Sequence, residues 1–147
     1  MPRKYVAVCG ASEATASQLE SAREVGKLLA EAGVVVINGG LGGVSAAASE
    51  GAARAGGTVV GILPDTDRHG ANPNLTISLP SGMGQARNVL IVTAAESVIA
   101  IGEGWGTLSE IAVARRLGRP VVALDSWSVK GLDSVGTAAE AVRRAIE

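Results

Sequence analysis

The segment VVVINGGLGGV, residues 34–44, joins a short apolar run, a glycine-rich loop and the start of an alanine-rich stretch. The run 34–37 consists of Val and Ile, which is typical of a buried strand. The loop 38–43 follows, and 44–55 has the small-residue composition of a helix packed closely on a sheet. Residues 58–63 form the next apolar run. The segment therefore predicts a parallel strand–helix–strand unit.

The same alternation extends in both directions along the chain. The predicted strands are 5–9, 34–37, 58–63, 75–79, 97–101 and 121–124, and the predicted helices are 17–32, 44–55, 84–94, 107–117 and 134–146. Repetition of strand, crossover helix and strand indicates an α/β fold. We therefore expect a single Rossmann-like three-layer domain over residues 1–147, with a mainly parallel sheet and helices on both faces.

The composition excludes several classes of protein. Hydrophobic residues make up 47% of the 147 residues but aromatic residues only 2%, so the core must consist of Val, Ile, Leu and Ala. The formal net charge of −1 does not fit the basic surface of a nucleic-acid-binding protein. No signal peptide or membrane-length apolar stretch is present, and the single cysteine, Cys9, excludes an internal disulfide. We expect a cytoplasmic protein without nucleic-acid or membrane partners.

Three glycine-rich loops follow predicted strands and should lie at the same edge of the sheet. Glycine lets backbone N–H groups approach an anion, and the helix after each loop directs the positive end of its dipole there. This predicts a site for a phosphate or another compact anion. The predicted binding residues are Gly10 and Ser12, then Gly39, Gly40, Gly42 and Gly43, and then Gly102, Gly104, Gly106 and Thr107. Tight turns alone are the alternative explanation for these glycines.

Two charged residues, Arg87 and Glu110, are predicted to lie beside these loops. A guanidinium and a carboxylate there are suited to orient a ribose and hold an anion. Glu110 follows Thr107 by three residues, so the pair also fits a capping box at the start of the helix 107–117. Cys9 is interpreted as a core residue. No cluster of His, Cys, Asp or Glu has metal-ligand spacing, and neither a dinucleotide-binding nor a Walker-type motif is present.

Three pieces of the chain resemble the LOG (Lonely Guy) superfamily, whose members were often labelled possible lysine decarboxylases. The segment GGLGGV (39–44) resembles the first glycine loop of that superfamily. The segment GQARN (84–88) is similar to its Arg-Lys helix start, and GWGTLSE (104–110) resembles its Pro-Gly-Gly-x-Gly-Thr-x-x-Glu signature. The order and spacing of these pieces span nearly the whole chain. Nothing in the sequence supports lysine decarboxylation.

The resemblance implies a phosphoribohydrolase as one possible function. Such LOG enzymes split a nucleoside 5′-monophosphate into base and ribose 5-phosphate. By resemblance, Gly104, Gly106 and Thr107 would hold the phosphate, and Arg87 and Glu110 would be the catalytic pair. N-glycosidic cleavage passes through an oxocarbenium-like ribose, which a carboxylate stabilises.

Two departures from the enzyme pattern favour binding without chemistry. The chain carries Gly-Glu-Gly at 102–104 in place of Pro-Gly-Gly, and Arg87-Asn88 in place of Arg-Lys. Both are similar to a branch that includes molybdenum-cofactor carrier proteins, whose ligand is a phosphorylated pterin. We therefore expect a nucleotide or another phosphorylated ligand, such as a molybdopterin-type cofactor, with Asn88 among the binding residues and no cofactor required. The resemblance also implies a homodimer or homotetramer.

Overall fold

Short runs of Val and Ile form the centre of one parallel sheet, as the sequence predicts. The computed structural model describes residues 3–147. Its strands are β1 (Tyr5–Gly10), β2 (Val35–Asn38), β3 (Val59–Leu63), β4 (Ile77–Pro80), β5 (Ser97–Gly102), β6 (Val121–Ser126) and β7 (Asp133–Val135). They pair in the order β4-β3-β2-β1-β5-β6-β7, and every neighbouring pair is parallel.

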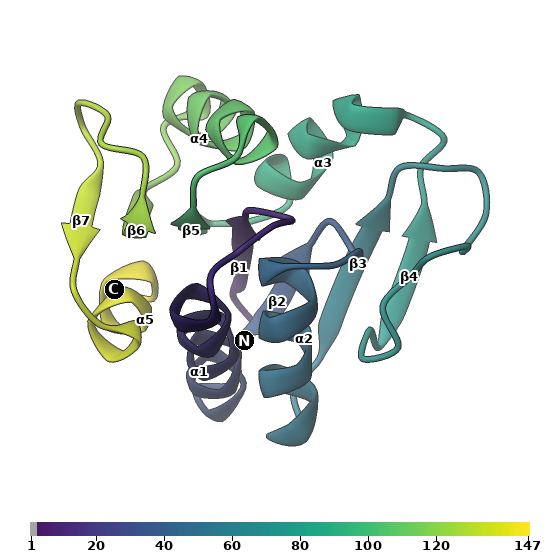
Figure 1. Cartoon of the computed structure of the whole chain (residues 1–147), viewed down its shortest axis with the longest axis horizontal. Coiled ribbons are helices and arrows are strands. Elements are labelled where there is room, and N and C mark those ends of the chain that lie inside the picture. Colours follow the sequence, from purple (N-terminus) through teal and green to yellow (C-terminus); the bar gives the residue numbers. More distant parts are fainter. Residues whose placement is uncertain (1–2) are drawn as a thin grey trace.

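Helices cover both faces of this sheet, which confirms the predicted α/β architecture (Figure 1). The helices are α1 (Ala16–Glu31), α2 (Val44–Arg54), α3 (Arg87–Thr93, after a 3₁₀ turn at Gly84–Ala86), α4 (Trp105–Leu117) and α5 (Ala138–Ala145). Helices α1, α2 and α5 lie on one face, and α3 and α4 lie on the other. Within residues 3–147, none of these helices combines the length and apolar character needed to cross a lipid bilayer.

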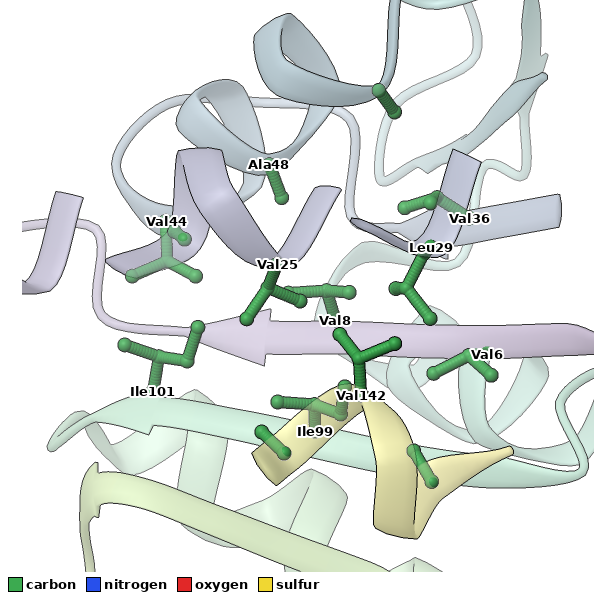
Figure 2. Close-up of a cluster of buried hydrophobic side chains, with 14 of the residues drawn as sticks. Val6, Val8, Val25, Leu29, Val36, Val44, Ala48, Ile99, Ile101 and Val142 are labelled. Carbon is green, nitrogen blue, oxygen red and sulfur yellow. The ribbon is translucent and has the colours of Figure 1, made fainter. Parts of the chain in front are cut away.

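Alternate residues of the central strand β1 point into two separate cores. Val6 and Val8 pack in the cluster beneath α1, α2 and α5, beside Val25 and Ile99 (Figure 2). Ala7 and Cys9 belong to the cluster beneath α3 and α4. Because β1 is buried on both faces, its sequence is a continuous run of apolar residues and does not alternate between apolar and polar residues.

The order of the strands reverses between β1 and β5. Strands β2, β3 and β4 extend the sheet on the β1 side, and β6 and β7 extend it on the β5 side. The chain leaves β1 toward α1 on one face and leaves β5 toward α4 on the other (Figure 1). In parallel sheets, ligands bind in the crevice at such a reversal, at the carboxyl ends of the strands.

The prediction of one helix over 134–146 is wrong at its start. The segment Asp133–Val135 instead forms the edge strand β7, in register with β6, and α5 begins at Ala138. Thr137 caps α5, because its hydroxyl oxygen accepts a hydrogen bond from the Glu140 N–H at 3.2 Å. Strand β6 also runs two residues beyond the predicted end, to Ser126. A strand as short as β7 has too few residues to show a period.

Helices α1 and α2 approach each other closely at two glycines. A Cβ atom on Gly26 would overlap the carbonyl oxygen of Ala48, and one on Gly51 would overlap that of Arg23. The small residues at this contact let the two backbones meet directly. Because α2 begins at the second glycine-rich loop, this packing also fixes the position of that loop.

We predict that Gly51→Ala lowers the free energy of unfolding by about 1–3 kcal/mol, the usual cost of overpacking a core. This loss should appear although alanine is the better helix former. Denaturant titration measures it. The matched control is Gly136→Ala, because no other atom lies within 4 Å of a Cβ built there. Equal stability of the Gly51 variant and the wild type would contradict the close contact.

Candidate functional site

A cleft of about 570 Å³ opens at the carboxyl ends of β1, β2 and β5. Its volume lies within the range of about 300–1,000 Å³ that is typical of small-molecule sites. The loops after these three strands form its wall together with the start of α3. The cleft therefore lies where the order of the strands reverses.

Residues predicted from all three loops and from α3 meet in this cleft. Those that line it are Gly10, Ser12, Gly39, Gly42, Arg87, Asn88, Gly104, Gly106, Thr107 and Glu110. Gly40, Gly43 and Gly102 are not among the lining residues. Their φ angles of 75°, 64° and 78° lie in the left-handed region, so these glycines serve the turns that shape the wall.

The helices α2 and α4 begin at the cleft without a side-chain cap. Their N-cap residues are Gly43 and Gly104, and neither provides a side-chain hydrogen bond to the first turn. Helix α1, by contrast, has a complete capping box formed by Thr15 and Gln18. Free N–H groups together with the helix dipole make a helix start suitable for an anion. The first N–H group of α2, that of Val44, already donates to the Ala11 carbonyl at 3.1 Å, so the start of α4 is the better candidate.

The predicted capping box of Thr107 and Glu110 is wrong. Helix α4 starts at Trp105, two residues earlier than predicted, because Gly104 is extended (φ −149°, ψ 155°) and acts as the N-cap. Thr107 is therefore the third residue of the helix, and Glu110 lies in its second turn. Glu110 is thus free of a capping role and lines the cleft.

Arg87 is the only basic residue among the described residues that line the cleft. It is only 6% exposed. Its Nε donates to the carbonyl of Ile62 at 2.7 Å, and its Nη2 donates to the carbonyl of Gly39 at 3.3 Å. Burial lowers the pKa of Arg87, whereas the charges of Glu110 and Asp65 raise it. Arg87 therefore places a positive charge at the cleft and ties α3 to β3 and to the second loop.

Glu110 is the acidic counterpart of Arg87, and it is 8% exposed. Burial raises the pKa of Glu110 to about 7, although a hydrogen bond from Cys9 and the charge of Arg87 act in the opposite direction. The Cys9 thiol donates to Glu110 Oε2 at 2.9 Å. Burial and the nearby carboxylate raise the pKa of Cys9 well above its usual value, so the thiol keeps its proton and remains a donor.

Asn88 connects the two helices that flank the cleft. Its Oδ1 accepts a hydrogen bond from Arg87 Nη1 at 3.0 Å, and its Nδ2 donates to Ser109 Oγ at 3.1 Å. Ser109 in turn donates to the carbonyl of Gly106 at 2.7 Å.

Glu103, an acid in the third loop, is exposed and lies outside the cleft lining. Its charge therefore does not face an anion in the cleft.

Sequence reasoning missed several residues of this wall. They are Ala11, Leu41, Ser45, Gln85, Ile91, Trp105 and Ser109, together with Cys9, which was interpreted as a core residue only. Cys9 is in fact buried, but it also contacts Glu110, which is 101 positions away along the chain. Trp105 could have been predicted as a site residue from the sequence, because it is one of two tryptophans and lies inside the third glycine-rich loop.

We predict that Glu110→Gln stabilises the ligand-free protein at pH 8 but not at pH 4.5. A carboxyl whose pKa rises on folding binds its proton more tightly in the folded state. Its stabilising contribution is therefore complete below the ordinary pKa of 4.5 and is lost as the pH rises through about 7. Relative to the variant, the wild type should lose about 3 kcal/mol of unfolding free energy across this range. Denaturant titrations of both proteins at several pH values measure the difference, and a pH-independent difference would contradict it.

Sequence comparison relates this geometry to a known family. The model of the SLOG cluster4 family matches residues 3–145. An uncharacterized protein from Archaeoglobus fulgidus is 42% identical over 147 residues, which cover 99% of this chain and 97% of that protein.

Solved structures that share the whole fold include two molybdenum-cofactor proteins. The molybdenum cofactor binding protein of the phototrophic bacterium Rippkaea orientalis has a TM-score of 0.93 and 31% identity, over 100% of this chain and 99% of that one. The molybdenum cofactor carrier protein of Chlamydomonas reinhardtii has a TM-score of 0.86 and 27% identity, over 99% and 97%. These matches confirm the LOG-type resemblance and the branch that contains the carrier proteins. The chain belongs to the SLOG cluster4 family.

Proposed function

We propose that this protein binds a phosphorylated small molecule in the cleft, and that the ligand is a cofactor of the molybdopterin type. The observation that carries the proposal is the uncapped start of α4, where the residues from Gly104 to Thr107 line the same cleft as Arg87. The likeness to a cofactor-binding and a cofactor-carrier protein over nearly the full chain supports the same ligand.

The phosphate would bind at the first turn of α4. Backbone N–H groups and the helix dipole favour an anion there. The Thr107 hydroxyl is a further donor, and Arg87 supplies the positive charge. The rest of the wall combines glycine, serine and amide groups, which suit the polar edges of a pterin ring, with apolar side chains such as Leu41 and Ile91, which suit its faces. In this arrangement the phosphate contacts the start of α4 and the charge of Arg87, and the ring contacts the rest of the wall.

Binding without turnover fits the contacts of the two charged residues. Arg87 already donates to two backbone carbonyls and to Asn88, and Glu110 already accepts from Cys9. These hydrogen bonds fix the two side chains in place. A cleft that is preorganised in this way loses less conformational freedom when a ligand binds. We therefore assign both residues to binding and to the shape of the cleft.

A second candidate function is phosphoribohydrolase activity on a nucleoside 5′-monophosphate. The observation that favours it is the position of the Glu110 carboxylate in the cleft, with its pKa raised to about 7. In such a reaction, ionised Glu110 would stabilise the oxocarbenium-like ribose as the bond to the base breaks.

Product analysis separates the two functions. We predict that the wild type releases no free base from AMP, GMP, CMP or UMP. Chromatography of the reaction mixtures, with Glu110→Gln as the matched control, measures this. Release of base by the wild type that the Gln variant abolishes would instead establish the hydrolase.

A substitution at Gly106 tests the position of the phosphate. A Cβ on Gly106 meets only Asn88 Nδ2, at 3.9 Å, so a side chain fits there. We predict that Gly106→Asp weakens binding of the molybdenum cofactor at least tenfold, because like charges about 5 Å apart repel by about 3 kcal/mol near a protein surface. The variant should not be less stable than the wild type, since an acid in the first turn of a helix is favourable.

The matched control is Gly106→Asn, which adds nearly the same volume without charge. It should retain most of the affinity. Calorimetric titration with cofactor released anaerobically from a molybdenum enzyme measures all three proteins. Equal affinity of the Asp and Asn variants would exclude a phosphate at the start of α4.

A further inference from the structure

Two of the three aromatic side chains of this protein lie together at the cleft. The sequence contains two Trp, one Tyr and no Phe. Trp105 lines the cleft, and the ring of Trp127 lies against it. Trp105 is 79% exposed, whereas the other exposed large apolar side chains of the described residues are 37–47% exposed. An indole held in water at the rim of a cleft has apolar area available for a ligand.

The Trp105 ring is supported from one side. Its centroid lies 5.4 Å from that of Trp127, with an angle of 38° between the ring planes. Trp127 Nε1 donates to the carbonyl of Gly104 at 3.1 Å, and Trp127 packs against the core beneath α3 and α4. Trp127 is therefore fixed at the base of the same loop that carries Trp105. It leaves the outer area of the Trp105 ring free.

The place of Trp105 in α4 relates the ring to the anion site. Trp105 is the first residue of the helix, directly after the N-cap Gly104 and directly before Gly106. The indole ring and the N–H groups that would bind the anion are therefore on the same turn of helix α4. A ligand that places its phosphate on this turn has its other end within reach of the indole.

We propose that Trp105 is a stacking platform that selects phosphorylated ligands carrying a planar heteroaromatic ring. The ring of the ligand lies on the exposed face of the indole while its phosphate lies at the start of α4. This inference rests on the proposed function and adds the residue that recognises the ring. A pterin and a nucleobase both have the flat π-face that such stacking requires, and a sugar phosphate has none.

The test compares a ligand that has a ring with one that lacks it. The molybdenum cofactor is the first probe, and ribose 5-phosphate, measured by calorimetry or by competition, is the second. Trp105→Leu should weaken binding of the cofactor by about fivefold to a hundredfold, the range for loss of one stacked ring. Trp105→Phe keeps an aromatic face and should retain more affinity than the Leu variant. Neither variant should change the affinity for ribose 5-phosphate.

Leu117→Ala is the matched control, because Leu117 is an exposed apolar residue at the far end of α4. It should bind both probes like the wild type. A fluorescence titration adds an independent reading. In Trp127→Phe, Trp105 is the only remaining tryptophan, and the cofactor should quench its emission while ribose 5-phosphate should not.

The outcomes separate this inference from the proposed function. If the wild type binds neither probe, the proposed function fails and the platform fails with it. If the wild type binds the cofactor and Trp105→Leu binds it equally well, only the platform is overturned. Equal losses of cofactor and ribose 5-phosphate would show that Trp105 merely shapes the loop. If Trp105→Leu dissociates an oligomeric wild type into monomers, the ring is instead covered by a second copy of the chain.

Discussion

The parallel pairing of β1 with β5 is the constraint on which the cleft depends. The register runs from Val6 opposite Ser97 to Gly10 opposite Ile101, and the Ala11 N–H continues it by donating to the Ile101 carbonyl at 3.2 Å. A side chain at Gly10 would collide with the same carbonyl oxygen, so the two strands can stay this close only with glycine there. The chain then turns to α1 on one face and to α4 on the other, and the cleft is lined by residues of both loops.

Around the cleft, several residues lack the stabilising contacts that similar residues make elsewhere in the protein. Away from the cleft, α1 has a complete capping box and α5 is capped by Thr137, whereas α2 and α4 begin there without a side-chain cap. A carboxyl is buried, and an indole is left in water. Each of these features is unfavourable in the ligand-free protein. Together they place N–H donors, charge and an apolar face at one cleft, and departures of this kind are expected where function rather than stability selects the residue.

The sequence predicted the parts of the fold that depend on local pattern. Apolar runs located the central strands, and the glycine-rich loops were placed correctly at the carboxyl ends of these strands. Each apolar run and the glycines after it lie within a few residues of one another, so both can be recognised locally. The contact between Cys9 and Glu110 could not be read in this way, since it joins residues 101 positions apart through the pairing of β1 with β5. The start of α4 was misplaced because Thr107 is the better capping residue by type, yet the extended backbone of Gly104 takes that position. Strand β7 gains its structure from β6 rather than from its own three residues.

If the cleft holds an anionic ligand as proposed, its charges couple the binding of that ligand to a proton. With Glu110 ionised, its charge offsets that of Arg87, and with Glu110 protonated the positive charge of Arg87 is uncompensated. The pKa of about 7 puts this change near neutral pH. A phosphate in the cleft would raise the pKa of Glu110 further, and by reciprocity a proton on Glu110 strengthens the binding of the phosphate. Cys9 opposes this shift, because its thiol hydrogen bond favours the ionised carboxylate. The pH at which the cleft changes from neutral to positive therefore follows from burial of Glu110, which is the larger effect, and from the opposing hydrogen bond of the Cys9 thiol.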